Sequence, residues 1–340
     1  MKIPQPYLLF LGDVSDPLAA KTARGIHDWR PNSCIGQMRL SECKVSLGLS
    51  DLTPEAAFNL GAKTLVLGTA NAGGYIPKHW IEAIKEAITN GLNIASGLHQ
   101  KLTDLPELVS LAKKHNVSLF DVRHPQSTIN VGSGAKRNGQ RVLSVGTDCS
   151  VGKMYTSLAL EAEMKKLGMH AEFRATGQTG ILVAGEGISI DAVVSDFISG
   201  ATESISPAND DSHWDVIEGQ GSLFHPSYAG VSLGLLHGSQ PDWLVMCHEM
   251  GRPHTRHLPH HPLVDIEDCI NANLYNARVT NPQVQLAGIS VNTSNYSEDQ
   301  ALAYLTALTE KFEVPATDTV RFGLKPIAEF LHAKQLDKAV

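Results

Sequence analysis

The amino-terminal part of the chain alternates short apolar runs with longer stretches whose apolar residues recur every three or four positions. Short apolar runs are typical of buried strands, and the longer period is typical of helices. The runs that predict strands are residues 7–11, 64–68, 92–95 and 117–121. The stretches that predict helices are residues 19–29, 77–89 and 105–114. Strands that alternate with helices indicate a parallel sheet covered on both faces.

A second alternation begins at Arg141, after a polar segment rich in Gly, Ser and Asn. The runs that predict its strands are residues 142–145, 170–176, 216–218, 243–247 and 284–291. The stretches that predict its helices are residues 153–167, 191–201, 265–276, 297–311 and 326–334. We therefore expect an α/β protein of two doubly wound parallel-sheet domains, residues 1–135 and 136–340.

The composition narrows the class of protein. The chain has 340 residues, of which 42% are hydrophobic and 19% charged, and its formal net charge is −7. Without a basic stripe there is no electrostatic reason to expect nucleic acid or an anionic membrane as a partner. The first residues do not resemble a signal peptide, and no window approaches the roughly 20 apolar residues that cross a bilayer, so we expect a cytoplasmic protein. The five cysteines form no Cys-x-x-Cys pair and are expected to be reduced thiols.

The strongest chemical signal is a loop between the predicted strand 142–145 and the predicted helix 153–167, with the sequence Gly-Thr-Asp-Cys-Ser-Val-Gly-Lys. Its glycines let backbone N–H groups converge on an anion, and the start of the helix adds positive potential. The lysine supplies a mobile charge, so this is a predicted phosphate-binding loop. The residues expected to hold the phosphates are Gly146, Thr147, Asp148, Cys149, Ser150, Val151, Gly152, Lys153 and Met154.

Position 154 departs from the usual pattern of such loops. The residue after the lysine is normally Ser or Thr, whose hydroxyl binds Mg²⁺ beside a triphosphate, and here it is Met154. Thr156 occupies another direction on the helix and is a poor substitute. The loop therefore suits a diphosphate without metal-assisted phosphoryl transfer. This favours a ligand such as coenzyme A over ATP and does not favour bound Mg²⁺.

Four segments of the second half resemble dethiobiotin synthetase, in the same order along the chain. The loop 146–153 is similar to its Gly-Thr-Asp-Thr-x-Val-Gly-Lys-Thr loop. Residues 173–180 resemble its Lys-Pro-x-x-Thr-Gly substrate segment, which implies substrate contacts for Arg174, Gln178 and Thr179. Residues 216–221 resemble its Val-Glu-Gly-Ala-Gly segment, whose glutamate is a metal ligand and matches Glu218. Residues 288–292 are similar to its adenine-side strand end, which implies a cofactor contact for Asn292.

A longer resemblance, over nearly the whole chain, is to the two-domain family DUF1611. The segments that carry it include Ala-Thr-Gly-Gln-Thr-Gly-Ile at 175–181, Glu-Gly-Gln-Gly-Ser-Leu at 218–223, Gly-Leu-Leu-His-Gly-Ser at 234–239 and Cys-His-Glu at 247–249. The resemblance implies a Rossmann-like first domain and a P-loop second domain. Members of this family include D-glutamate N-acetyltransferase. It therefore implies transfer of an acetyl group from acetyl-CoA to the amine of D-glutamate, in D-amino-acid catabolism, and a small amino acid as substrate.

The implied reaction needs a base that frees the amine. Eight of the fifteen histidines lie in the stretch 213–261, which indicates a site in the second domain. His225 is the preferred general base because it follows the end of the strand 216–218, at the edge where an open α/β sheet gathers its ligands. His248 leaves another strand at the same edge. Glu218 remains open as a base, a magnesium ligand or the residue that orients a histidine.

Cations are needed to hold the carboxylates of glutamate, and guanidinium groups do this in two-point geometry. Arg252 and Arg174 are the candidates. The histidine-rich segment 254–261 contains a His-x-x-x-His spacing, but prolines within and beside it disfavour the helix that would present both rings to zinc, so no metal site is expected there. We expect a homo-oligomer.

Two other functions remain open. The chain could be an ATP- and Mg²⁺-dependent ligase or kinase of the dethiobiotin synthetase type. It could also be a non-catalytic protein whose altered loop binds a nucleotide without turning it over.

Overall fold

The protein divides into two compact units in the computed structural model, which describes residues 2–69, 74–124 and 128–339. The first unit comprises residues 1–127 and 177–192, and the second comprises residues 128–176 and 193–340. The observed boundary after residue 127 and the expected one after residue 135 both lie in the polar segment that precedes Arg141. Residues 125–127 of this segment lie outside the described part. Each unit is described by itself below.

The first unit is built on a five-stranded parallel sheet in the order β2-β1-β3-β4-β5. Its strands are β1 (Tyr7–Gly12), β2 (Cys34–Arg39), β3 (Thr64–Leu67), β4 (Asn93–Ser96) and β5 (Leu119–Asp121). Its helices are α1 (Lys21–Trp29), α2 (Pro54–Asn59), α3 (Ile81–Thr89), α4 (Pro106–His115) and α6 (Gln178–Ala184). Apolar side chains that point to one face of the sheet, such as Leu8 and Leu65, pack with Ile84 of α3 into a buried core.

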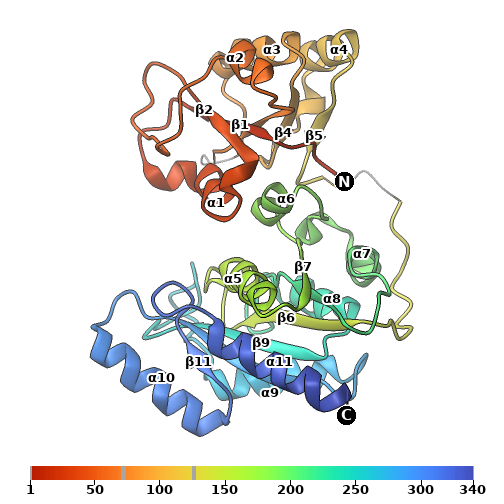
Figure 1. The fold of residues 1–340 in the computed structure, drawn as a ribbon, viewed down its shortest axis with the longest axis vertical. Coiled ribbons are helices and arrows are strands. Elements are labelled where there is room, and N and C mark those ends of the chain that lie inside the picture. Colours follow the sequence, from red (N-terminus) through yellow and green to blue (C-terminus); the bar gives the residue numbers. More distant parts are fainter. Residues whose placement is uncertain (1, 70–73, 125–127, 340) are drawn as a thin grey trace. The chain divides into compact units, whose positions relative to one another are not determined.

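Helix α6 joins the first unit although it lies far along the chain, after the phosphate loop. It packs against α1, and the two helices lie side by side in Figure 1. Arg123 donates a hydrogen bond to Gln178 and forms an ion pair with Asp191, with 2.8 Å between Nη1 and Oδ2. The N–H of Ile3 donates to the carbonyl of Gly185. These contacts make residues 177–192 part of the first unit.

The second unit is built on a six-stranded parallel sheet in the order β11-β10-β9-β6-β8-β7. Its strands are β6 (Gln140–Gly146), β7 (His170–Arg174), β8 (His213–Ile217), β9 (Trp243–Glu249), β10 (Gln285–Asn292) and β11 (Ala316–Thr317). Its helices are α5 (Lys153–Lys166), α7 (Ile198–Ile205), α8 (Ala229–Ser239), α9 (Ile266–Ala277), α10 (Glu298–Phe312) and α11 (Lys325–Ala339). The expected α/β class with two parallel sheets is confirmed.

The order of strands gathers the chemistry of the second unit at one edge. Strands β6, β9 and β10 are neighbours and parallel, so Gly146, Glu249 and Asn292 end at the same edge of the sheet. β8 lies on the other side of β6 and brings Glu218 to that edge. Helix α5 packs with α11 over one face, where Val142 and Val245 of the strands are buried.

The helix expected at residues 191–201 is the clearest difference from the sequence pattern. That stretch forms two short 3-10 turns, at Ile190–Ala192 and Ser195–Phe197, and the α-helix begins only at Ile198. In the described residues, no helix combines the length and apolar character needed to cross a membrane.

Candidate functional site

The loop between β6 and α5 has the backbone shape of an anion cradle. Ser150 and Gly152 both have left-handed backbone angles, with φ of 55° and 99°, and Gly152 is the residue that caps the start of α5. Such turns, together with the free N–H groups at a helix start, direct several backbone donors toward one point. The N–H of Thr147 donates to the carbonyl of Cys247, which ties the loop to β9.

Lys153 is buried at the floor of this loop and is 8% exposed. Its Nζ donates to the backbone carbonyl of Asp148 at 2.8 Å. Burial lowers the pKa of this amine below its usual value. A desolvated ammonium that donates to a neutral carbonyl gains most from an anion placed beside it.

The side chain of Asp148 holds the loop in place through three hydrogen bonds. Its buried carboxylate accepts from the N–H of Cys149 at 2.6 Å, from Nη1 of Arg252 at 2.8 Å and from the N–H of Arg256 at 2.7 Å. Arg252 also donates to the carbonyls of Cys149 and Ser150 and pairs with Glu249. The guanidinium expected to bind substrate carboxylates is therefore directed at the loop itself, where it holds the loop in shape.

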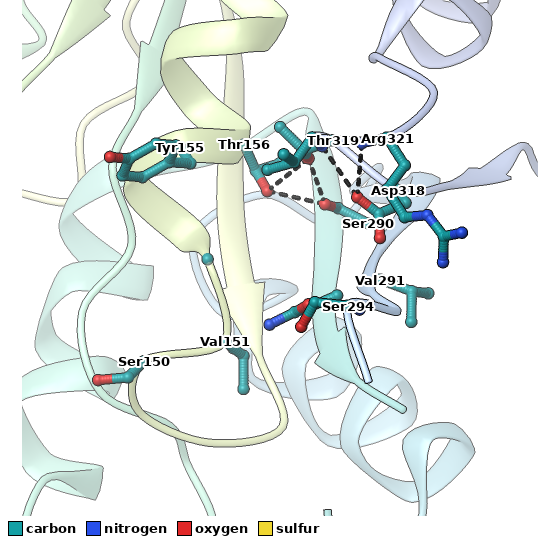
Figure 2. Close-up of a pocket in the computed structure, with 13 residues that line it drawn as sticks. Ser150, Val151, Tyr155, Thr156, Ser290, Val291, Ser294, Asp318, Thr319 and Arg321 are labelled. Atoms are coloured by element: carbon teal, nitrogen blue, oxygen red, sulfur yellow. Dashed lines mark hydrogen bonds between the residues drawn. The ribbon is translucent and has the colours of Figure 1, made fainter. Parts of the chain in front are cut away.

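Two cavities flank the start of α5. The first, of about 430 Å³, is lined by Cys149, Ser150, Gly152, Lys153, Met154, Tyr155, Glu218, Gly219, Gln220 and Gly221. The second, of about 370 Å³, is drawn in Figure 2 and is lined by Ser150, Val151, Gly152, Tyr155, Thr156, Ser290, Val291, Asn292, Ser294, Asp318, Thr319, Val320 and Arg321. Ser150, Gly152 and Tyr155 line both, so the two cavities meet at the phosphate loop.

The first cavity sets Lys153 opposite the segment 218–221. Glu218 is 4% exposed, and its Oε2 accepts from the N–H of Thr176 at 2.9 Å. Gly219 passes so close to β6 that a side-chain carbon there would lie 1.7 Å from the carbonyl oxygen of Ser144. Met154 lines this cavity with a thioether, so the hydroxyl that completes a magnesium site in other phosphate loops is missing from its usual position.

The second cavity is lined at its base by hydroxyl groups. Thr156 of α5, Ser290 of β10 and Thr319 form a hydrogen-bonded cluster, with distances of 2.7 to 3.3 Å between their oxygens (Figure 2). Asn292, expected to contact the cofactor, lines this cavity, and its Oδ1 accepts from the N–H of Ser294. The segment 318–321 was not predicted to be functional, because it contains no apolar run and no recognisable motif.

His248 is placed beside the loop but is engaged there. Its Nδ1 lies 3.1 Å from Oγ1 of Thr147. Burial first, and then the positive charge of Arg252, lower the pKa of His248 to about 4. The imidazole is therefore neutral at pH 7 and is a weak base toward an ammonium group.

His225 is also buried and has backbone partners for both ring nitrogens. Its Nδ1 accepts from the N–H of Ser227 at 3.1 Å, and its Nε2 lies 3.4 Å from the carbonyl of Arg256. Its ring packs on Tyr228, with 4.4 Å between ring centres. Neither His225 nor His248 is among the residues that line the two cavities, and the choice of His225 as general base stays a prediction.

The residues expected to bind substrate are not brought together within one unit. Arg174 ends β7 in the second unit, where its Nε pairs with Asp215 and its Nη2 with Glu172, both at 2.7 Å. It would have to exchange these carboxylates for those of a substrate. Gln178 and Thr179 begin α6 in the first unit.

Two groups of side chains within the described residues have ligand atoms close enough to share a metal ion. They are Asp148 with Cys149 and His225, and Glu172 with His213 and Asp215. In both groups a carboxylate already pairs with an arginine, Arg252 in the first and Arg174 in the second. These paired carboxylates fit a metal ion poorly. Neither group includes a histidine of the segment 254–261.

Two family models match successive parts of the chain, and the second match includes residues 177–192, which pack in the first unit. Residues 39–125 match the model of the DUF1611 amino-terminal Rossmann-like domain, and residues 129–328 match the DUF1611 P-loop domain, each described as a domain of unknown function. A crystal structure of a DUF1611 family protein from Anabaena variabilis is similar with a TM-score of 0.81 and 30% identity, over 97% of this chain and all of that one.

Two curated proteins are similar over nearly the whole chain. A D-glutamate N-acetyltransferase of a Pseudoalteromonas species is 54% identical over 96% of this chain and 98% of its own length. A protein of the same name from Tritonibacter scottomollicae is 49% identical over 97% of this chain and 99% of its own length. The Rossmann-like and P-loop domains expected from the sequence are thereby confirmed, and the chain belongs to the DUF1611 family.

Proposed function

We propose that this protein transfers an acetyl group from acetyl-CoA to the amine of D-glutamate, as a step in the breakdown of that amino acid. The name shared by two relatives of about 50% identity over nearly the full length supports the activity. The observation that carries the choice of donor is the phosphate loop. It sets a buried lysine beside a cavity of about 430 Å³ and follows that lysine with a thioether in place of a hydroxyl.

This loop suits the diphosphate of coenzyme A. Lys153 exchanges the neutral carbonyl of Asp148 for a phosphate oxygen, and the N–H groups at the start of α5 donate to the same anion. No phosphoryl group is transferred in acetylation, so the magnesium-binding hydroxyl that Met154 replaces is not required. The brace from Arg252 to Asp148 holds the loop in its binding shape before the ligand arrives.

The reaction joins the amine nitrogen of D-glutamate to the carbonyl carbon of the thioester. The carbon–sulfur bond breaks, coenzyme A leaves as a thiolate, and the amine proton passes to a base and then to the thiolate. Of the three side chains expected to be catalytic, Glu218 is the one that lines either of the two cavities beside the loop. We therefore assign the base to Glu218. This role requires the pantetheine arm to fold back over the loop toward residues 218–221.

The activity is tested by release of the free thiol of coenzyme A from acetyl-CoA by the purified full chain. D-glutamate should release it and L-glutamate should not. ATP hydrolysis without thiol release would replace this proposal with a ligase or kinase. Binding of acetyl-CoA or ATP without turnover of either would favour a non-catalytic nucleotide-binding protein.

Glu218→Gln separates the role of base from a role as a metal ligand that helps to position coenzyme A. As a base, Glu218 contributes about 10²- to 10⁴-fold to kcat, so the variant should lose that factor with little change in the Kd of coenzyme A. Glu310→Gln, on the exposed surface of α10, is the matched control. If the variant kept the wild-type kcat, Glu218 would not be the base. If the variant lost only affinity for coenzyme A, Glu218 would be a residue that positions the ligand.

A further inference from the structure

The second cavity carries a cation that the proposed reaction does not use. Arg321 lines this cavity, and its Nη1 donates to the carbonyl of Tyr296 at 3.1 Å and to both oxygens of Thr293 at 3.3 Å. Within the described part of the chain, its Nε and Nη2 have no hydrogen-bond partner, and its guanidinium forms no ion pair. Figure 2 shows the side chain extending away from the hydroxyl cluster. The guanidinium is thus anchored at one nitrogen and lies over the ring of Phe322, 5.4 Å from its centre, while its other two nitrogens have no hydrogen-bond partner among the described residues.

Asp318 fixes the turn that carries this arginine and does not neutralise it. Its Oδ2 accepts from the N–H and the hydroxyl of Thr293, at 2.8 and 2.7 Å. Its Oδ1 accepts from the N–H groups of Val320 and Arg321, at 2.9 and 3.0 Å. Four donors occupy the carboxylate, so the cation of Arg321 stays available to an anion from outside the protein.

The position of the cavity indicates which part of a ligand would reach Arg321. Ser150, Gly152 and Tyr155 line both cavities, so a ligand whose diphosphate lies at Lys153 would extend its nucleoside into the second one. The hydroxyls of Thr156 and Ser290 and the amide of Asn292 offer polar contacts there. Coenzyme A carries a phosphate on its ribose 3′-oxygen, and ATP and ADP do not.

We propose that Arg321 binds the 3′-phosphate of acetyl-CoA and so selects coenzyme A over nucleotides that lack this group. This inference rests on the proposed acetyl donor. A guanidinium with two open N–H groups binds phosphate with two parallel hydrogen bonds. Charge-assisted hydrogen bonds of this kind change affinity by about 10- to 100-fold.

The test compares coenzyme A with 3′-dephospho-coenzyme A by calorimetric titration of the full chain. The wild type should bind coenzyme A about 10- to 100-fold more tightly. Arg321→Gln should bring that ratio close to one by weakening only the phosphorylated ligand. Arg321→Lys keeps a charge without the two-point geometry and should give an intermediate ratio.

Arg278→Gln is the matched control. Arg278 follows the carboxyl end of α9, at the edge of the sheet away from the loop, and it lines neither cavity. This variant should keep the wild-type ratio.

Three results would overturn the inference. The wild type could bind both ligands equally, Arg321→Gln could keep the wild-type ratio, or Arg321→Gln could weaken both ligands equally, which would make Arg321 a residue that shapes the pocket. If the wild type bound ATP but neither form of coenzyme A, the proposed donor itself would fail. This last result is distinct from the other three, because in each of those the wild type still binds coenzyme A.

Discussion

Lys153 is a residue whose place in the fold works against stability. It is a buried amine whose pKa is lowered by desolvation, so the folded state holds its positive charge at a cost. Such a cost is typical of a residue kept for its ligand. We expect Lys153→Met to weaken binding of coenzyme A by about 10-fold or more, because a charge-assisted contact to phosphate is lost.

The same variant should unfold at the wild-type Tm or above it, since a buried charge is removed. Calorimetric titration and thermal unfolding measure the two effects. Lys166→Met, at the exposed end of α5 where the side chain is 70% exposed, should change neither appreciably. A fall in Tm without a fall in affinity for Lys153→Met would contradict the assignment of this lysine to the phosphate.

The lowered pKa of His248 predicts that the stability of the fold depends on pH. Its pKa is about 4 in the folded protein, against a usual value of 6.5, because of burial and of Arg252. The unfolded chain binds the proton more readily, so stability is fully present above pH 6.5 and is lost as the pH falls through 4. By linkage this amounts to about 3 kcal/mol.

His248→Asn removes the titrating ring and keeps a polar atom near Thr147. The wild-type unfolding free energy should fall by about 3 kcal/mol more than that of the variant between pH 7 and pH 4, as measured by urea denaturation. A difference between the two proteins that stays constant over this range would show that the ring is not held neutral by its surroundings.

At the scale of elements, the close approach of the segment after β8 to β6 depends on a glycine. A side-chain carbon at Gly219 would lie 1.7 Å from the carbonyl oxygen of Ser144 and 3.0 Å from Cδ of Lys153. We expect Gly219→Ala to lower the free energy of unfolding by about 1–3 kcal/mol and to weaken the binding of coenzyme A. The added carbon would force both the backbone at Ser144 and the side chain of Lys153 to move.

Gly230 is the matched site for comparison. It lies in the first turn of α8, and a side-chain carbon there meets nothing within 4 Å. Gly230→Ala should leave binding unchanged and raise the free energy of unfolding by up to about 1 kcal/mol. Equal effects of the two substitutions, in urea denaturation and calorimetry, would show that the contact with Ser144 does not limit the strand.

Elements with a strong local pattern were predicted well, and elements without one were not. β6 and α5 combine an apolar run, a glycine loop and a helical period, and they form where expected. β2, with the sequence Cys-Ile-Gly-Gln-Met-Arg, lacks a sustained apolar run and was missed. Helix α8 was missed as well, because its three glycines weaken the helical signal and its stability comes from packing on α7 and α9.

For the whole molecule, the assignment of residues 177–192 to the first unit predicts which unit a substitution in the core of α6 destabilises. Leu182 of α6 is fully buried. We expect Leu182→Ala to lower the free energy of unfolding by about 2–5 kcal/mol. Hydrogen exchange should then speed up in β1 to β5 rather than in β6 to β10.

Leu236→Ala, in the buried face of α8, should have the reverse pattern, because this residue belongs to the second unit. Faster exchange in β6 after substitution of Leu182 would contradict the assignment of α6 to the first unit. The expected homo-oligomer and cytoplasmic location stay predictions, and light scattering of the purified chain checks the first.

The sequence by itself determined the two α/β halves, the phosphate loop and the absent hydroxyl at Met154, because each depends on the order of residues within a short stretch. Only the tertiary structure decided which residues from distant parts of the chain contact one another. It shows that Arg252 pairs with Asp148, that His225 contacts backbone groups, that α6 belongs to the first unit and that Arg321 lines a cavity together with the loop. These pairings join residues from separate strands and turns, and which side chains meet depends on the register and packing of the sheet, which local periodicity does not specify.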